Sequence, residues 1–429
     1  MNITEKKNNF FTFLLILFPI SLISGPLLPE IISFLLLIYF FINFSTFEKK
    51  NFFKDKIILF LFFYYIYLLV ISFLKIELLE FLSDQFFYFR FILFSLAVYS
   101  LISINKNIFN YLGYCFVVLF FLLIVDVIVQ YSFGKNIIGI GTFAPNRYSG
   151  LFGDELVLGG YLSRFFPLLI GLIYINEHFK FKNILIVFFC LLVVIGVFIS
   201  GERTALGLTF VTLFFLFIKK DMRKNALIIV TLVLVSLIIL SYFNKSQRYR
   251  IFIEPFHQMS LLSEKFLNKY EDVSVEYSKE SLTKFNLFSS HHHDHYITGI
   301  KIFKDNILFG VGPEQFRIKC KLKKYATGND PCSTHPHNFL IQVLSETGIV
   351  GLCFYLFVLI FLIKEIYKNI NLKKYGSIKD IEYFVYLSFL INLWPFFPSG
   401  NLFNNWLSFI IYFPLGFYLY AKNYKDERT

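Results

Sequence analysis

Long apolar segments, separated by short polar ones, follow one another along most of the chain. A run of about 18 or more apolar residues is long enough to cross the hydrocarbon core of a bilayer as a helix. We predict about twelve such helices, at residues 10–25, 28–46, 57–74, 81–103, 108–132, 155–176, 183–200, 203–218, 225–243, 338–363, 381–397 and 402–421. The pattern therefore predicts an all-α integral membrane protein.

The composition supports the same fold class. Apolar residues make up 56% of the 429 residues, charged residues make up 16%, and the mean hydropathy is +0.63. A soluble domain contains about 25% charged residues. An ordinary soluble protein is therefore excluded.

The basic residues predict how the helices are oriented. Lys and Arg recur in one set of loops and near both ends of the chain, whereas the short loops of the other set contain only Lys75, Lys135, Arg147 and Arg203. Because cytoplasmic loops are enriched in Lys and Arg, we expect both termini in the cytoplasm. The net charge of +12 first reflects this topology, so it does not indicate a nucleic-acid partner.

One long polar segment interrupts the succession of apolar runs. Residues 244–337 are rich in charge and fall on the outer face, and long loops cross a membrane largely regardless of their charge. We therefore expect nine membrane helices in 1–243, a periplasmic loop domain of short amphipathic helices in 244–337, three membrane helices in 338–421 and a cytoplasmic tail in 422–429.

Two of the five cysteines lie in this outer segment. Cys320 and Cys332 are separated by about a dozen residues, whereas Cys115, Cys190 and Cys353 fall within or at the ends of predicted spans. In an oxidising periplasm the outer pair is expected to form a disulfide. Metal binding by the pair is a weaker alternative, because no second pair of cysteines lies at zinc-site spacing.

Arg90, Asp126 and Arg164 are charged residues embedded in predicted spans. A charge at the centre of a bilayer costs at least ~2.5–3.5 kcal/mol, so such residues are candidates for function. All three lie in the outer halves of their spans, and we expect Arg90 and Arg164 to contribute to substrate binding there. The alternative is that these two arginines extend to the interface or pair with acids and serve packing alone.

Arg147 and Arg203 are unusual because they lie in short outer loops, where cations are disfavoured. Each has glycine and serine nearby, in Arg147-Tyr148-Ser149-Gly150 and in Ser200-Gly201-Glu202-Arg203. Glycine beside a helix start lets an anion approach backbone N–H groups, and a guanidinium matches phosphate oxygens. We predict that these arginines bind a phosphate or diphosphate, with a structural pairing of Arg203 and Glu202 as the alternative.

A histidine-containing segment precedes the tenth predicted span, in the order Ser333-Thr334-His335-Pro336-His337-Asn338. A histidine at the mouth of a membrane helix can take a proton from a hydroxyl at neutral pH. We expect His335 or His337 to act as the base, and Asn338 to orient the ring or contact substrate. The alternative is a histidine that only fills the polar rim of the helix.

A second group of histidines occurs at His291-His292-His293-Asp294-His295. Consecutive residues point in different directions, so the run is a poor ligand set for one metal ion. We expect no metal site and no cofactor, and we expect His295 to line the same cleft as the later histidines.

Together these motifs resemble the bacterial O-antigen ligase and O-antigen polymerase superfamily, over about residues 120 to 410. The resemblance rests on Arg147 with the segment 149–155 and Gly159, on the turn 200–203, on Gly310-Val311-Gly312-Pro313 with Phe316, and on 335–338 followed by Glu346-Thr347-Gly348. Each motif is weak alone, and their order and topology make the combination specific.

The resemblance implies an enzyme of the bacterial inner membrane that transfers a glycan from a polyprenyl (undecaprenyl) diphosphate carrier, by a metal-independent, inverting reaction. A ligase delivers the glycan to lipid A–core, whereas a polymerase delivers it to a second lipid-linked glycan. By position in the motifs, Arg147 and Arg203 would hold the diphosphate and His337 would be the base. The presence of two histidines leaves the choice between His335 and His337 open.

Two other classes of protein agree less well with the sequence. A transporter or flippase usually has internal repeats and polar groups near the membrane midplane, and neither is evident here. A scaffold for glycan-assembly enzymes leaves the outer arginines unexplained. The sequence does not distinguish a ligase from a polymerase.

Overall fold

The computed structural model describes residues 3–44, 55–77, 85–259, 261, 286–370 and 378–423. Within these ranges the chain is helical and contains no named β-strand. Several parts of the predicted topology lie outside the described residues. They are the start of the predicted span 81–103, the tail residues 424–429, residues 262–285 of the outer segment, and the lysine-containing loops 45–54 and 371–377.

Each predicted span coincides with a helix. The long helices are α1 (Ile3–Ser21), α2 (Leu27–Ile42), α4 (Lys56–Lys75), α6 (Arg90–Ile104), α7 (Ile108–Phe133), α8 (Leu158–Ile175), α9 (Lys182–Ser200), α10 (Arg203–Ile218), α11 (Arg223–Phe243), α17 (Phe339–Asn369), α18 (Ile381–Asn392) and α19 (Asn405–Asn423). The all-helical fold class predicted from the apolar pattern is confirmed.

Fewer of the described helices meet the length and hydropathy expected of a membrane span than the twelve predicted. Among the described residues, six helices are long and apolar enough to cross a membrane, and a seventh candidate combines the end of α11 with residues 245–258 across a bend of 117°. The apolar parts of α1, α2, α10 and α18 are shorter. The protein is therefore a multi-pass membrane protein, and the count of twelve spans stays a prediction.

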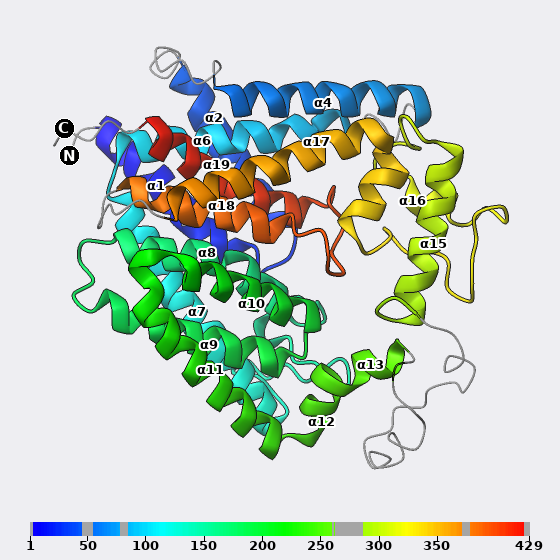
Figure 1. Ribbon diagram of the computed structural model, residues 1–429. Coiled ribbons are helices and arrows are strands. Elements are labelled where there is room, and N and C mark those ends of the chain that lie inside the picture. Colours follow the sequence, from blue (N-terminus) through cyan, green and yellow to red (C-terminus); the bar gives the residue numbers. More distant parts are fainter. Residues whose placement is uncertain are drawn as a thin grey trace.

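The core forms where these helices pack side by side. α6 packs against α19, while α8 packs against α9, α10 and α18 (Figure 1). Every residue from Leu158 to Leu172 except Gly160 is buried, because neighbours surround α8 on all sides. The outer end of this central helix is therefore a fixed point on which short loops can be built.

The outer segment between α11 and α17 contains shorter helices: α12 (Lys245–Arg248), the π-helix η6 (Tyr249–Ile253), α13 (Glu254–Gln258), α15 (Ser290–Asp305) and α16 (Phe316–Lys319). In Figure 1, α13, α15 and α16 lie on the side of the molecule opposite the labels of the two termini. Ile302, Val311, Phe316 and Tyr325 form a small separate core, with a disulfide between Cys320 and Cys332 beside it.

This segment is attached to α17 at a break in the helix. Gly348 has φ 65°, in the left-handed region that favours glycine, and it interrupts helical geometry within α17. The N–H of Gly312 donates to the carbonyl of Glu346 at 2.8 Å, and the N–H of Ile349 donates to the carbonyl of Ile307 at 2.9 Å. The break thus provides backbone groups that hold the loop containing Gly312 against the start of α17.

Candidate active site

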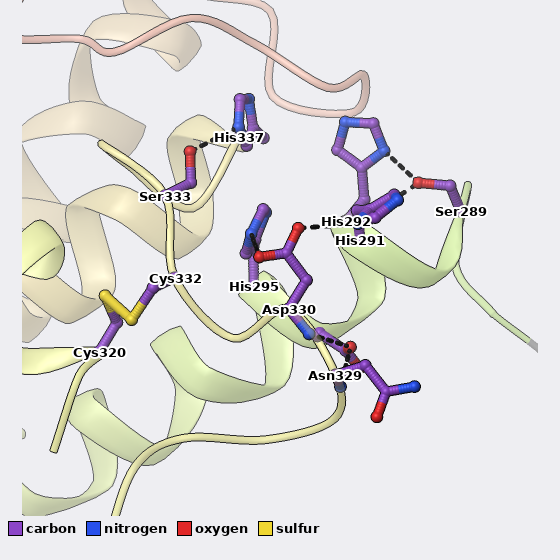
Figure 2. Close-up of polar contacts among 11 residues, drawn as sticks. Ser289, His291, His292, His295, Cys320, Asn329, Asp330, Cys332, Ser333 and His337 are labelled. Atoms are coloured by element: carbon purple, nitrogen blue, oxygen red, sulfur yellow. Dashed lines mark hydrogen bonds and ion pairs between the residues drawn. A yellow bond between two sulfur atoms is a disulfide. The ribbon is translucent and has the colours of Figure 1, made fainter. Parts of the chain in front are cut away.

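His337 lies immediately before the N-cap of α17 and is held in an unusual backbone conformation. Its φ is 54°, and its carbonyl accepts a hydrogen bond from the N–H of Ser399 at 2.9 Å. A non-glycine residue in this region is strained, so the surrounding contacts must stabilise it. The ring nitrogen Nε2 is 2.9 Å from the hydroxyl of Ser333, as Figure 2 shows. Both the backbone and the ring of His337 are therefore positioned.

His335 has less freedom to react. Its Nδ1 is 2.9 Å from the hydroxyl of Thr334 and its Nε2 is 3.0 Å from the carbonyl of Ser399. Because a carbonyl only accepts, Nε2 of the neutral ring carries the hydrogen and Nδ1 accepts from Thr334. With both nitrogens engaged and the side chain buried, His335 is better suited to positioning than to taking a proton.

Three other imidazoles gather around His337. The centroid of its ring lies 4.1 Å from that of His335, 5.2 Å from that of His295 and 5.5 Å from that of His292. Burial lowers the pKa of His337 to about 3 and that of His335 to about 4, and it also lowers the pKa of His295. These lowered pKa values favour the neutral imidazole, which is the form that accepts a proton.

The side chain of Asn338 caps the start of α17. Its side-chain oxygen accepts from the N–H of Ile341 at 3.2 Å and caps α17, and its amide donates to the carbonyl of Pro395 at 3.0 Å. The hydrogen bond to the His337 ring comes from Ser333 instead. The motif contained Ser333, but no sequence signal pointed to Ser399, which is 62 positions from His337.

The two outer-loop arginines lie near the start of α10. Arg203 donates to the side-chain oxygen of Gln258 at 2.9 Å and lies 3.6 Å from the carboxylate of Glu254, both in α13. Arg147 donates to the carbonyl of Leu156 at 3.1 Å. The two guanidinium groups are partly exposed, and the charge of Arg203 contributes to a lowered pKa of Arg147, after burial. The two arginines are thus close enough for their charges to interact.

Glu202 does not bind Arg203 in the way that the structural alternative required. Its carboxylate accepts from the N–H groups of Gly159 and Gly160, at 2.6 and 3.0 Å, at the start of α8. Burial raises the pKa of Glu202 to about 7, while the charge of Arg147 acts in the opposite direction. Glu202 therefore fastens the α9–α10 turn to the central helix.

Arg203 is connected to the segment before α15 through Gln258. The side chain of Gln258 binds Arg203, and its carbonyl accepts from the amide of Asn286 at 3.5 Å, just before α15 begins. His292, in the first turn of α15, has its pKa lowered to about 3 by burial first, and also by the charges of His337, His295 and Arg203. The cations and the candidate base thus border one region.

Arg90 and Arg164 are placed differently from the sequence expectation. Arg90 forms an ion pair with Glu30 at 3.0 Å and its guanidinium lies 4.7 Å from the centre of the Phe91 ring. Arg164 is buried and donates to the carbonyl and the side-chain oxygen of Asn392, at 3.2 and 3.3 Å. These contacts match the packing alternative, and a role in substrate binding stays a prediction for both.

The run of histidines in α15 faces more than one way. His291 is exposed and pairs with Asp330 at 2.8 Å, and Nδ1 of His293 accepts from the N–H of Leu287 at 3.3 Å. His292 and His295 turn toward His337, and Nε2 of His295 lies 4.0 Å from the carboxylate of Asp330. Within the described part of the chain, no three His, Cys, Asp or Glu side chains are arranged to hold one metal ion.

Comparison with known proteins gives one match. Residues 188–356 match a family model described as O-Antigen ligase. The matched segment runs from α9 to the middle of α17 and contains Arg203, His335 and His337, whereas Arg147 precedes it. No curated protein matches the chain. This match supports the resemblance to the O-antigen ligase and O-antigen polymerase superfamily that the motifs indicated.

Proposed function

We propose that the protein is a membrane glycosyltransferase of the O-antigen ligase type. It moves a glycan from an undecaprenyl diphosphate carrier to a hydroxyl of lipid A–core, at the periplasmic face of the bacterial inner membrane. The observation that carries the proposal is the series of contacts from Arg203 through Gln258 and Asn286 to α15 and His337. These contacts bring cations suited to a diphosphate and a neutral imidazole suited to an acceptor hydroxyl to the same side of the protein.

The residues suggest a single displacement at the anomeric carbon. The acceptor oxygen forms a bond to that carbon, the bond to the diphosphate oxygen breaks, and His337 takes the hydroxyl proton. Displacement from the opposite side inverts the anomeric configuration. Arg147 and Arg203 stabilise the negative charge that the departing diphosphate gains, so the chain's own side chains supply this stabilisation.

The proposed topology has twelve spans with both termini in the cytoplasm. The start of α1 and the end of α19 lie on one side of the molecule in Figure 1, as an even number of spans requires. Residues 244–337 then form the periplasmic loop domain, on the side where the lipid-linked donor is presented. After the bend of 117° that follows α11, Gln247 donates to the carbonyls of Asn146 and Ile199, so the start of this loop is held against the end of α9.

The alternative within the same superfamily is an O-antigen polymerase, which uses the same donor and a second lipid-linked glycan as acceptor. The donor site is common to both reactions, so the surface glycan of a deletion strain distinguishes them. A ligase is expected to leave lipid A without long glycan while lipid-linked polymer accumulates. Lipid A carrying a single repeat unit would identify a polymerase.

Purified protein tests the chemistry directly. With an undecaprenyl diphosphate-linked oligosaccharide as donor and lipid A–core as acceptor, we expect a glycosylated lipid A product in the presence of EDTA, with an inverted linkage. A reaction that stops in EDTA and resumes with a divalent cation would contradict the metal-independent mechanism. Movement of intact donor across a vesicle membrane without any transfer would identify a flippase.

A further inference from the structure

Three consecutive histidines begin α15, and only the middle one faces His337. The ring of His292 is perpendicular to that of His337, at an interplanar angle of 90° and a centroid distance of 5.5 Å. His291 instead pairs with Asp330, and His293 accepts from the N–H of Leu287. The side chains around Ser289 and His292 appear in Figure 2. His292 therefore has a position that its two neighbours do not share.

Ser289 fixes the ring of His292. Its hydroxyl oxygen accepts from the N–H of His292 at 3.3 Å, as the N-cap of α15, and lies 2.7 Å from Nδ1 of the same residue. The arrangement that satisfies all three groups has the hydroxyl hydrogen directed at Nδ1, so Nε2 of the neutral ring carries the other hydrogen. Nε2 makes no hydrogen bond to the residues that the structure describes.

His292 is close enough to both Arg203 and His337 for their charges to act on its pKa. Arg203 binds the side-chain oxygen of Gln258, and Asn286, which precedes α15, binds the carbonyl of Gln258. The ring of His292 then extends toward His337. Burial and the neighbouring positive charges both oppose protonation of His292, so it remains neutral beside the arginines.

We propose that His292 is a further catalytic residue, whose Nε2–H donates a hydrogen bond to the diphosphate oxygen that leaves the anomeric carbon. This inference rests on the proposed glycosyl transfer. As the bond from the anomeric carbon to oxygen breaks, its electron pair stays on the diphosphate oxygen, and the hydrogen bond from His292 strengthens as that charge grows. His292 transfers no proton, and the proton of the acceptor goes to His337. Ser289 is the positioning residue for this donor.

Variants of the histidine run test the assignment with controls from the same turn. Loss of one preorganised donor of this kind typically costs about 10²–10³-fold in kcat. We expect His292→Ala and His292→Phe to lose about 10²-fold in transfer from an undecaprenyl diphosphate-linked oligosaccharide. His292→Gln retains an N–H donor and should recover much of the rate. His291→Ala and His293→Ala should stay within about twofold of wild type, because neither ring contacts the site.

The outcomes separate this inference from the proposed function. Rates are normalised to the monodisperse protein measured by size-exclusion chromatography, and His337→Ala is assayed in parallel. If His292→Ala transfers glycan at the wild-type rate while His337→Ala is inactive, the role of His292 is overturned and the proposed function stands. If His292→Gln is as slow as His292→Phe, the hydrogen-bond donor role is overturned. Wild-type transfer rates in both His292→Ala and His337→Ala overturn both histidine roles, and absence of any transfer by the wild-type protein overturns the proposed function itself.

Discussion

Reduction of the disulfide is expected to slow transfer by releasing Ser333 from the His337 ring. Cys332 directly precedes Ser333 and forms a disulfide with Cys320, at the end of α16. The helix α16 is itself held in place, because the N–H of Phe316 donates to the carboxylate of Glu346 at 3.0 Å. At its other end the same segment is held by Asp294, which accepts from the N–H groups of residues 329 and 330 at 3.0 and 3.3 Å. Ser333 is thus presented by a loop fastened at two places.

The expected magnitude follows from the length of the closed loop. Cys320 and Cys332 are 12 positions apart, and a disulfide closing a loop of this size stabilises by about 3 kcal/mol on the chain-entropy model. The two backbone hydrogen bonds to Asp294 contribute about 1 kcal/mol each. Because every 1.4 kcal/mol is tenfold, opening the disulfide weakens loop closure by about 10²-fold, which sets the upper limit on the loss of rate.

The assay compares wild type with Cys320→Ser/Cys332→Ser, each with and without a phosphine reductant. We expect kcat to fall by about 10- to 100-fold on reduction of wild type, with a smaller effect on the KM of the lipid-linked donor, because Arg147 and Arg203 lie outside this loop. The double variant should have the rate of reduced wild type, and reductant should not change that rate. Cys353→Ser, which removes an exposed free thiol, should respond to reductant as wild type does.

Two results would refute this reasoning. Mass spectrometry of protein prepared without reductant could recover Cys320 and Cys332 as free, alkylatable thiols, and the bridge would then be absent. Alternatively, protein shown to be fully reduced could keep at least half of the wild-type rate, and the bridge would then not position Ser333. Ser333→Ala should also slow transfer, and its effect should not add to that of reduction, since both act through one contact.

Three further predictions concern the arginines, the base and Glu202. Arg147→Lys and Arg203→Lys keep the charge but lose the planar fork, so transfer should fall at least tenfold at unchanged protein level; wild-type rates would limit these arginines to topology or packing. Because the pKa of His337 is lowered to about 3, kcat/KM should stay level from neutral pH down to about pH 5. A fall in kcat/KM with a midpoint near pH 6.5 would contradict a buried, neutral base. Burial raises the pKa of Glu202 to about 7, so the folded protein holds a proton that the unfolded chain releases near pH 4.5. The contribution of Glu202 to the free energy of unfolding therefore falls as the pH rises from about 4.5 to about 7. The melting temperature of Glu202→Gln should depend less on pH in this range than that of wild type.

The helices were predictable because each apolar run is long and continuous. α7, for example, covers 108–133, against a prediction of 108–132. The number of spans was less predictable, since α10 and α18 are only 16 and 12 residues long and length alone does not decide whether they cross. The break at Gly348 was also missed, because a single glycine within an apolar run gives no warning of a left-handed residue.

The candidate site was predictable where function concentrates in short motifs. His335 and His337 were identified from six consecutive residues, and the structure places their rings 4.1 Å apart. Arg90 was selected because charges in a membrane are costly, and its pairing with Glu30 depends on packing between helices far apart in the sequence. Contacts such as Ser399 with both histidines likewise arise only when the turn between α18 and α19 folds back onto the start of α17.

The central claim is that His337 takes the proton of the acceptor hydroxyl, and one comparison tests it most directly. Single-turnover transfer is measured with purified His337→Ala and His335→Ala, using undecaprenyl diphosphate-linked oligosaccharide and lipid A–core, together with binding of the donor. Loss of a positioned base typically costs 10²–10⁴-fold, so His337→Ala should lose at least 10²-fold in rate with donor binding nearly unchanged, and His335→Ala should be milder. Full activity of His337→Ala, or a severe loss confined to His335→Ala, would contradict the assignment.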